Sequence, residues 1–199
     1  MRKNNKTKGI DKVKALLNPI RQTYLSQIPF FQLNLRIMKM IKDPNLISYR
    51  TAKVTDLKVI QNLFVETINQ TCKQDYSKAQ LKVWLKSIEN KDRWFNAIND
   101  QYFLLAEKEQ QLLGFGSLKL NNYVDFLYTS PKAQQQGIAK GILKELIKKA
   151  NKAKQNKVTS DVSITAKPFF LKQGFKVLKT NKNMVHDQIL INYKMELIL

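Results

Sequence analysis

The chain has 199 residues and a mass of 23.2 kDa, which is the size of one domain with an extension. Its 35 Lys and Arg residues outnumber 15 Asp and Glu residues and give a net charge of +20, a balance that attracts nucleic acids, anionic membranes or phosphate-rich cofactors. Because the basic residues are mostly scattered lysines, we interpret the excess mainly as a solvated surface, and nucleic-acid binding is not favoured.

The chain has a single cysteine, Cys72, and a single histidine, His186, which exclude an intramolecular disulfide and a His/Cys metal site. The lone cysteine is typical of a reducing compartment, so we expect a cytoplasmic protein without a metal. No apolar run approaches the roughly 20 residues of a membrane helix, and the basic N-terminus is not followed by the apolar core of a secretory signal.

We expect residues 1–45 to form a basic N-terminal extension and residues 46–199 to form the functional domain. The apolar residues of the extension are spaced for one helical face, but Pro19 should kink or end that helix. Three interpretations compete: a flexible basic arm, an amphipathic surface helix, or an upstream extension of the reading frame with the start at Met38 or Met40. The first and third are favoured.

The first half of the domain predicts a strand, two helices and a hairpin. Residues 46–52 alternate as in a strand, and Thr55 is expected to cap the helix that follows. The pattern Ser77-x-x-Gln80 is a capping-box signature at the start of a second helix. Two apolar runs within residues 101–120, joined by a polar turn, are typical of a β-hairpin.

The second half predicts a strand at residues 123–128 and a long helix after Gly137, with Ala150 near the end of its apolar stripe. A short strand, a short helix that ends at Gly174 and two final strands follow. The predicted order is therefore β-α-α-β-β-β-α-β-α-β-β.

The turn before the long helix fits the pattern Gln134-x-x-Gly137-x-Ala139. The first turn of a helix has unpaired N–H groups and about half a positive charge, so it binds phosphate oxygens. Small residues allow a phosphate to approach the backbone, and Lys140 would add charge at the rim. Taken alone, so permissive a pattern favours a helix that merely begins with glycine, and the context has to decide.

In its context, the turn resembles that of the GNAT superfamily of acyl-CoA-dependent N-acyltransferases. The resemblance rests on this turn after "DFLYTSP" and on "SITAKPFFLKQGF" about thirty residues later, and it covers about residues 46–199. "DYSKAQLKVWL" and "NYKMEL" add a resemblance to a bacterial subfamily of acetyltransferases with undefined acceptors. The resemblance to the GNAT superfamily implies an α/β (α+β) three-layer fold, with a mixed, mostly antiparallel sheet of about seven strands and helices on both faces.

The same resemblance implies direct acetyl transfer from acetyl-CoA to an amine in a ternary complex. The strand "YVDFLY" would splay from "VTSDVSI", and the pantetheine arm would bond to the main chain at Leu127 and Thr129. The pyrophosphate would lie on the amides of residues 135–140, and Phe169 and Phe170 would flank the sulfur end. The expected cofactor-binding residues are Leu127, Tyr128, Thr129, Gln134, Gln135, Gln136, Gly137, Ile138, Ala139, Lys140, Ser163 and Phe170.

Two positions depart from the superfamily pattern. The superfamily often has asparagine at the position of Ser163. At the position of Phe170 it often has tyrosine, which is the usual proton donor to the CoA thiolate. Phenylalanine cannot donate a proton, so another group or water donates, or activity is lost. The bacterial subfamily also carries phenylalanine here, which argues against a decayed enzyme.

The catalytic residues are predicted from their chemistry. Asp125, on a half-buried strand among aromatic residues, could have a raised pKa suited to a general base, although a solvated strand carboxylate or a salt bridge with a lysine would explain it as well. Tyr76 and Tyr128 are alternative hydroxyl groups. Trp84 is expected to be a core residue, and Trp94 to line or cover the acceptor pocket.

The acceptor is expected to be a small-molecule or peptide amine, and the protein a monomer or homodimer. Two other function classes remain as alternatives. The missing tyrosine favours a non-catalytic acyl-CoA-binding or regulatory module, and the charge of +20 suggests a nucleic-acid-linked protein that acts on tRNA.

Overall fold

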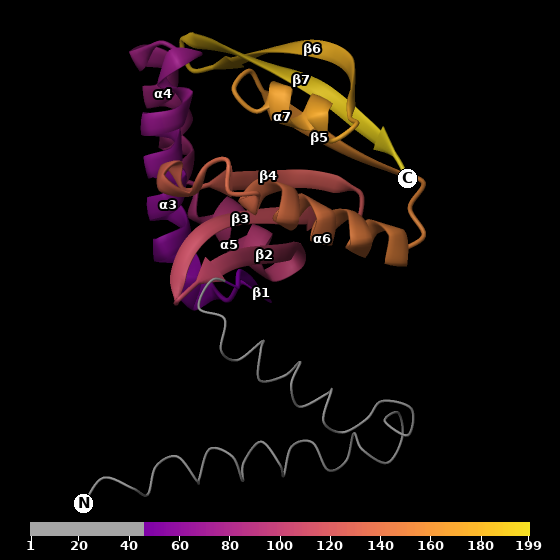
Figure 1. Ribbon diagram of the computed structural model, residues 1–199. Coiled ribbons are helices and arrows are strands. Elements are labelled where there is room, and N and C mark those ends of the chain that lie inside the picture. The colour runs from indigo at the N-terminus through magenta and orange to yellow at the C-terminus, as the bar shows by residue number, and fades with distance from the viewer. Residues whose placement is uncertain (1–45) are drawn as a thin grey trace, which may run out of the picture. The chain divides into compact units, whose positions relative to one another are not determined.

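The structure is a computed structural model that describes residues 46–199, so the expected N-terminal extension lies outside the described residues. Residues Ile47–Leu199 form one compact unit around a seven-stranded sheet (Figure 1). The strands are β1 (Ser48–Thr51), β2 (Tyr102–Lys108), β3 (Gln111–Lys119), β4 (Tyr123–Thr129), β5 (Lys157–Ser163), β6 (Lys176–Val185) and β7 (Gln188–Ile198). The α-helices are α3 (Leu57–Thr71), α4 (Lys78–Leu85), α5 (Lys91–Asp100), α6 (Ile138–Lys152) and α7 (Lys167–Lys172).

The strands are ordered β1-β2-β3-β4-β5-β7-β6 across the sheet. Strands β4 and β5 form the one parallel pair among the described strands, and the other neighbours are antiparallel. Helix α6 is the crossover between the two parallel strands. The predicted mixed, mostly antiparallel sheet of about seven strands is therefore confirmed.

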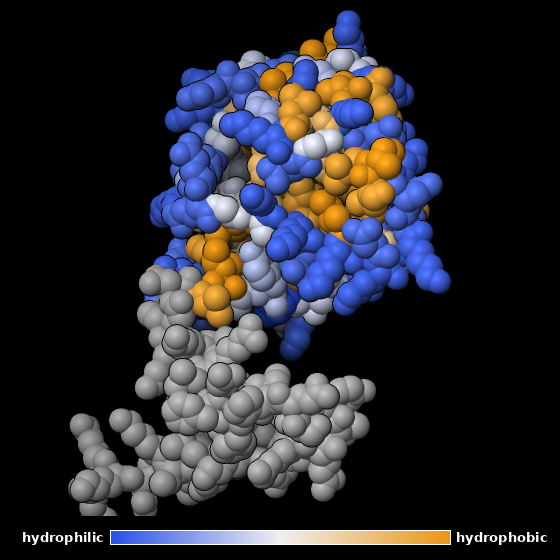
Figure 2. Space-filling model, turned by 45° about the vertical axis from the view of Figure 1, so that its right-hand side comes forward, coloured by the Kyte–Doolittle hydropathy of each residue, from blue (hydrophilic) through white to orange (hydrophobic). Residues whose placement is uncertain are grey.

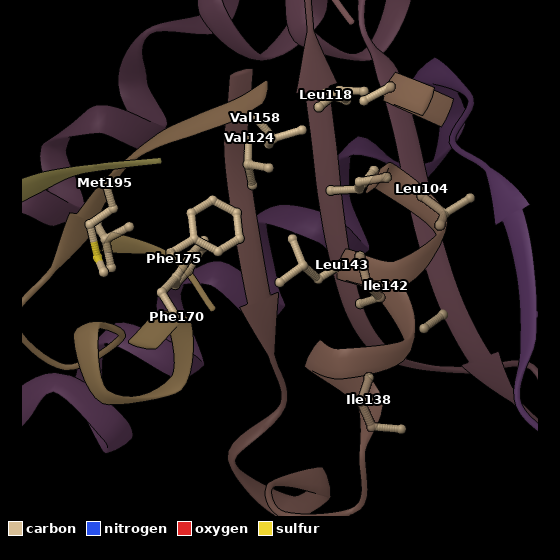
Figure 3. Packing of buried hydrophobic residues seen from close by; sticks show 14 of the residues in the cluster. Leu104, Leu118, Val124, Ile138, Ile142, Leu143, Val158, Phe170, Phe175 and Met195 are labelled. Carbon is tan, nitrogen blue, oxygen red and sulfur yellow. The ribbon is translucent and has the colours of Figure 1, made fainter. Parts of the chain in front are cut away.

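The sheet is covered by helices on both faces, which gives the three-layer arrangement expected from the sequence. On one face, Ile138, Ile142 and Leu143 of α6 point toward the strands, and Phe170 of α7 packs in the same cluster (Figure 3). On the other face, residues of α3, α4 and α5 pack against aromatic side chains of the sheet. Burying apolar side chains on both faces supplies the main force that holds such layers together.

Several local signals form the predicted structures. The Ser77 hydroxyl accepts a hydrogen bond from the Gln80 amide (3.2 Å), and the Gln80 side chain accepts one from the Ser77 amide (2.9 Å), so the capping box is confirmed. Strands β2 and β3 form the hairpin, with Glu109 and Gln110 in the left-handed region at its turn. The apolar stripe of α6 is buried down to Ala150.

Two predictions were wrong. Helix α5 has no counterpart in the predicted order, and it begins where the Asn90 side chain accepts a hydrogen bond from the Arg93 amide (2.9 Å). Thr55 does not cap α3, because a 3₁₀ turn (Val54–Asp56) precedes that helix, and the Asp56 carboxylate accepts from the Lys53 amide (2.8 Å).

The face of the described residues that Figure 2 shows is mostly hydrophilic, with an apolar area near its middle. Exposed large apolar side chains of the last third of the chain include Leu171, Leu178, Met184 and Ile198. No helix in residues 46–199 is both long enough and apolar enough to span a membrane.

Candidate active site

A gap opens in the sheet between β4 and β5. The two strands pair at only two positions, and the last of these joins Val124 and Ser160, whose hydroxyl also donates to the Val124 carbonyl (2.9 Å). Strand β4 stays paired with β3 as far as Thr129, and β5 stays paired with β7 as far as Ser163. The splay predicted between these strands is therefore present.

A cavity of about 520 Å³ occupies this gap and is lined from both faces of the sheet. Ligand sites commonly have volumes of this order and lie where strands diverge. Helices α6 and α7 and the turn before α6 line it on one face, and α3 and α4 line it on the other. Its charged lining residues are Asp125, Lys140 and Asp161.

The turn before α6 presents a row of unpaired backbone donors at one end of the cavity. The first hydrogen bond into α6 from this turn joins the Gly141 amide to the Gly137 carbonyl (2.9 Å). The amides of residues 135–140 donate no hydrogen bond of normal geometry to a described protein group. Consecutive free amides at a helix N-terminus form an anion-binding concavity, so the chemistry of this end fits a phosphate group.

Gly137 has a left-handed backbone, with φ of 81°, and Gln135 two residues before it has φ of 59°. A Cβ atom built at Gly137 would have no heavy atom within 4 Å, so the backbone faces open space there. The glycine is needed for its backbone conformation and leaves room for a ligand to approach the amides. Replacing Gly137 by a residue with a side chain, such as valine, would therefore strain the backbone, independently of any effect on ligand binding.

The glutamine side chains of the turn hold it in place. The Gln134 amide group donates to the Thr71 hydroxyl (2.7 Å) at the end of α3, and the Gln136 amide group donates to the Lys132 carbonyl (3.2 Å). These side-chain contacts do not use the main-chain amides of the turn. The polar residues that precede the glycine thus anchor the turn through their side chains.

Tyr128 also lines the cavity. Its ring packs against Phe64 and Phe115, at centroid distances of 4.9 and 5.3 Å. Burial raises the pKa of the Tyr128 hydroxyl well above 10, while the indole N–H of Trp84 acts toward a lower pKa. A neutral phenol hydroxyl can donate a hydrogen bond as well as accept one.

Asp125 also lines the cavity, from a β-bulge in β4. One carboxylate oxygen accepts from Arg93 (2.9 Å) and the other from the Gln101 side chain (2.8 Å). The Arg93 guanidinium also stacks over the Phe126 ring at 4.9 Å. The salt bridge that was one of the expectations for Asp125 is present, with an arginine rather than a lysine as its partner.

Tyr76 is buried and is not among the residues that line the cavity. Its hydroxyl donates to the Ile191 carbonyl (3.0 Å) and accepts from the Ile164 amide (2.9 Å). Burial is the main cause of the raised pKa of Tyr76, and the Ile164 amide acts in the opposite direction. Both hydrogen-bonding directions of this hydroxyl are used to join β7 to the end of β5.

The comparisons with known proteins agree with this geometry. The profile of the acetyltransferase (GNAT) domain matches residues 72–197. The uncharacterised N-acetyltransferase YafP of Escherichia coli K12 is 31% identical over 138 residues, which are 69% of this chain and 87% of YafP. The chain belongs to the GNAT acetyltransferases. It is thus an enzyme of the N-acetyltransferase class.

Solved structures show the same fold as this GNAT acetyltransferase. A GCN5-related N-acetyltransferase from Rhodopseudomonas palustris has a TM-score of 0.74 and 26% identity, over 76% of this chain and 95% of its own. The PaiA N-acetyltransferase from Thermoplasma acidophilum, solved in complex with coenzyme A, has a TM-score of 0.64 and 24% identity, over 77% of this chain and 99% of its own.

The two positions that depart from the superfamily pattern both line the cavity of this GNAT acetyltransferase. The Ser163 hydroxyl accepts from the Ala166 amide (3.1 Å), just before α7. Phe170 is buried and packs edge-to-face against Phe169 and Phe175, at 5.6 and 5.0 Å. The side chain at position 170 therefore contributes an apolar wall, and no hydroxyl replaces the usual one there.

Several residues of the cavity were not found from the sequence. Trp84, expected in the core, is half-buried and lines the cavity, whereas Trp94 is buried, donates to the Ser87 carbonyl (3.1 Å) and does not line it. Cys72 and Asp161 line the cavity as well. A helical stripe marks Trp84 as an apolar contact, and nothing in it separates a core face from the edge of a cavity.

Proposed function

We propose that this GNAT acetyltransferase transfers an acetyl group from acetyl-CoA to an amine by direct transfer in a ternary complex. The observation that carries the proposal is the cavity in the β4–β5 gap, with the free amides of residues 135–140 at one end. Acetyl-CoA supplies an activated acetyl thioester and leaves as the CoA thiol. The relative PaiA, whose structure contains coenzyme A, supports a cofactor of this class.

The end of the cavity formed by the turn before α6, which we call the phosphate end, fits a pyrophosphate. The amides provide donors without competing protein acceptors, the space at Gly137 is open, and Lys140 adds an exposed positive charge. The pantetheine arm would then follow β4 past Leu127 and Thr129. The Thr129 carbonyl already accepts from the Thr67 hydroxyl (2.9 Å), and a carbonyl oxygen can accept a second hydrogen bond.

We assign the catalytic hydroxyl to Tyr128. Its raised pKa keeps the phenol neutral at physiological pH, so its O–H can donate to the oxygen of the thioester as negative charge develops there. Trp84 lines the same cavity. This arrangement assigns no chemistry to Phe170, which agrees with its apolar surroundings.

Asp125 acts in this scheme as a positioning residue. Its two oxygens already accept from Arg93 and Gln101, and Gln101 in turn accepts from the Ser117 hydroxyl (2.6 Å). This chain of hydrogen bonds fixes the bulge of β4 beside the cavity. Tyr76 likewise supports the site from outside, through its bonds to the ends of β5 and β7.

Thermal unfolding of the full chain tests cofactor binding. Acetyl-CoA at about 100 times its dissociation constant should stabilise the fold by about 2.7 kcal/mol and raise the Tm. An unchanged Tm with acetyl-CoA, propionyl-CoA and CoA would contradict the proposal. A screen of amines with a free-thiol readout would then identify the acceptor.

The role of Tyr128 has its own test. Tyr128→Phe keeps the ring and its packing, so kcat should fall by about 10²- to 10³-fold, the usual effect of losing one oxyanion donor. The Tm shift with acetyl-CoA should remain. Tyr102→Phe, which removes a hydroxyl outside this cavity, is the matched control. Equal kcat values for the two variants would exclude Tyr128 as the donor.

A further inference from the structure

The cavity lining differs in charge from the rest of this basic chain. Among the described residues, Lys140 is the one cationic residue of the cavity lining, and it belongs to the turn that presents the free amides. The two lining carboxylates, Asp125 and Asp161, lie on β4 and β5, where these strands begin to separate. We propose, building on the proposed function, that the acceptor is an amine that carries a second positive charge, and that the Asp161 carboxylate binds this charge.

The Asp161 carboxylate is oriented by neutral donors. One oxygen accepts from the Tyr123 hydroxyl (3.1 Å) and the other from the Asn181 side chain (3.2 Å). The Asn181 amide group is itself held by the Asn192 side chain (2.8 Å) on β7. Hydrogen bonds from neutral groups fix the carboxylate in place without cancelling its negative charge.

No cation of the described residues forms an ion pair with Asp161. Lys194 lies directly opposite on β7, yet no ion pair joins the two side chains. Asp161 is also exposed, so a ligand that enters the cavity can reach its carboxylate. Its negative charge is available to a cation that comes from outside the protein.

Asp125 differs from Asp161 in this respect. Its side chain is only 8% exposed, and its charge is matched by Arg93 at 2.9 Å. The field around Asp161 nevertheless remains negative: burial first, and then the charges of Asp161 and Asp125, raise the pKa of Tyr123. The cation therefore binds to Asp161, and Asp125 adds to the attraction only at longer range.

The walls of the cavity suit the rest of such a ligand. Trp84 and Tyr128, two aromatic residues, line the same cavity as Asp161. Aromatic faces bind alkyl chains by burial, and they attract ammonium groups through the ring quadrupole. A short alkyl chain between two amino groups would place one amine near Tyr128 and the other near Asp161.

A pair of amines tests this specificity with the full-length enzyme. At saturating acetyl-CoA, release of the CoA thiol is measured with 1,4-diaminobutane and with 1-aminobutane, which differ by the second ammonium group. We expect kcat/KM for the diamine to exceed that for the monoamine by about tenfold or more, the usual effect of a hydrogen bond to a charged group. Asp161→Asn should remove most of this difference, mainly through KM for the diamine.

A matched variant removes an equal charge elsewhere. Glu109 lies in the exposed turn between β2 and β3, so Glu109→Gln should leave the preference for the diamine unchanged. Equal kcat/KM for the two amines in the parent enzyme, or equal effects of the two variants, would overturn the proposal. If acetyl-CoA raises the Tm but neither amine releases CoA thiol, the charged acceptor is wrong while the cofactor site stands. If acetyl-CoA does not raise the Tm, the proposed function itself fails.

Discussion

Replacing Gly137 by alanine distinguishes the role of this residue in backbone conformation from its proposed role in cofactor binding. The residue has φ of 81°, and a Cβ atom built there has no heavy atom within 4 Å. A left-handed backbone costs a residue with a side chain about 1–2 kcal/mol. The lower entropy of the unfolded chain offsets about 0.4–1 kcal/mol of this, so Gly137→Ala should destabilise the fold by about 1 kcal/mol.

The effect on binding should be larger. A methyl group on this turn occupies the open space through which a pyrophosphate would reach the amides of residues 135–140. Losing one hydrogen bond to a charged group weakens binding by about 1.5–3 kcal/mol, so the affinity for acetyl-CoA should fall about 10- to 100-fold. Without ligand, the Tm should fall by only about 2–4 °C.

Gly174 provides the matched control. It also has a left-handed backbone, with φ of 88°, and its Cβ would lie in ordinary contact with a Leu197 methyl group at 3.4 Å. Gly174→Ala therefore pays the same conformational penalty at a residue that does not line the cavity. The assay is the Tm of each variant without ligand and its acetyl-CoA affinity by calorimetry. Equal losses of affinity in both variants, or a Gly137→Ala affinity within twofold of the parent, would refute the phosphate site.

Two further predictions concern stability. Ser77→Ala removes the side-chain acceptor of the Gln80 amide and should reduce the free energy of unfolding by about 1 kcal/mol in chemical denaturation, whereas Ser87→Ala, whose side chain makes no such bond, should have little effect. Hydrogen bonds from Arg50 lower the pKa of Asp56 below 3.8, so the contribution of this carboxylate is fully present above that pH and is lost as the pH falls through the lowered value. Asp56→Asn should therefore show a weaker loss of stability on acidification than the parent, and equal acid titrations would contradict this.

Local signals in the sequence predicted most of the fold. The capping box at Ser77 and the amphipathic stripe of α6 are encoded within a few residues, so short-range patterns suffice to find them. Helix α5 is missing from the prediction because only Trp94, Ala97 and Ile98 are buried in it. The Asn90 cap was the available signal, and it was not recognised.

The candidate site was predictable only in part, for a geometric reason. The residues of the turn before α6 are contiguous, so they could be named from the sequence alone. The left-handed backbone conformation of Gly137 could not be predicted in this way. The cavity also brings together Cys72, Trp84 and Asp161 from separate elements. Each of them fits an ordinary core or surface role in its own segment, and only the packing of the helices on the splayed strands shows that they share a cavity.

The charge of the cavity limits what the net charge of +20 can mean for function. If scattered lysines bound the cofactor phosphates, several of them should line the phosphate end, but Lys140 is the one lysine there. Backbone amides are fixed in direction by the turn and cannot be neutralised, so they would supply most of the proposed anion site. The other lysines are then free to serve solubility. The same lysines would disfavour a cationic acceptor over most of the surface, so binding of a cation by the Asp161 carboxylate, as proposed, would give the enzyme a means to select one.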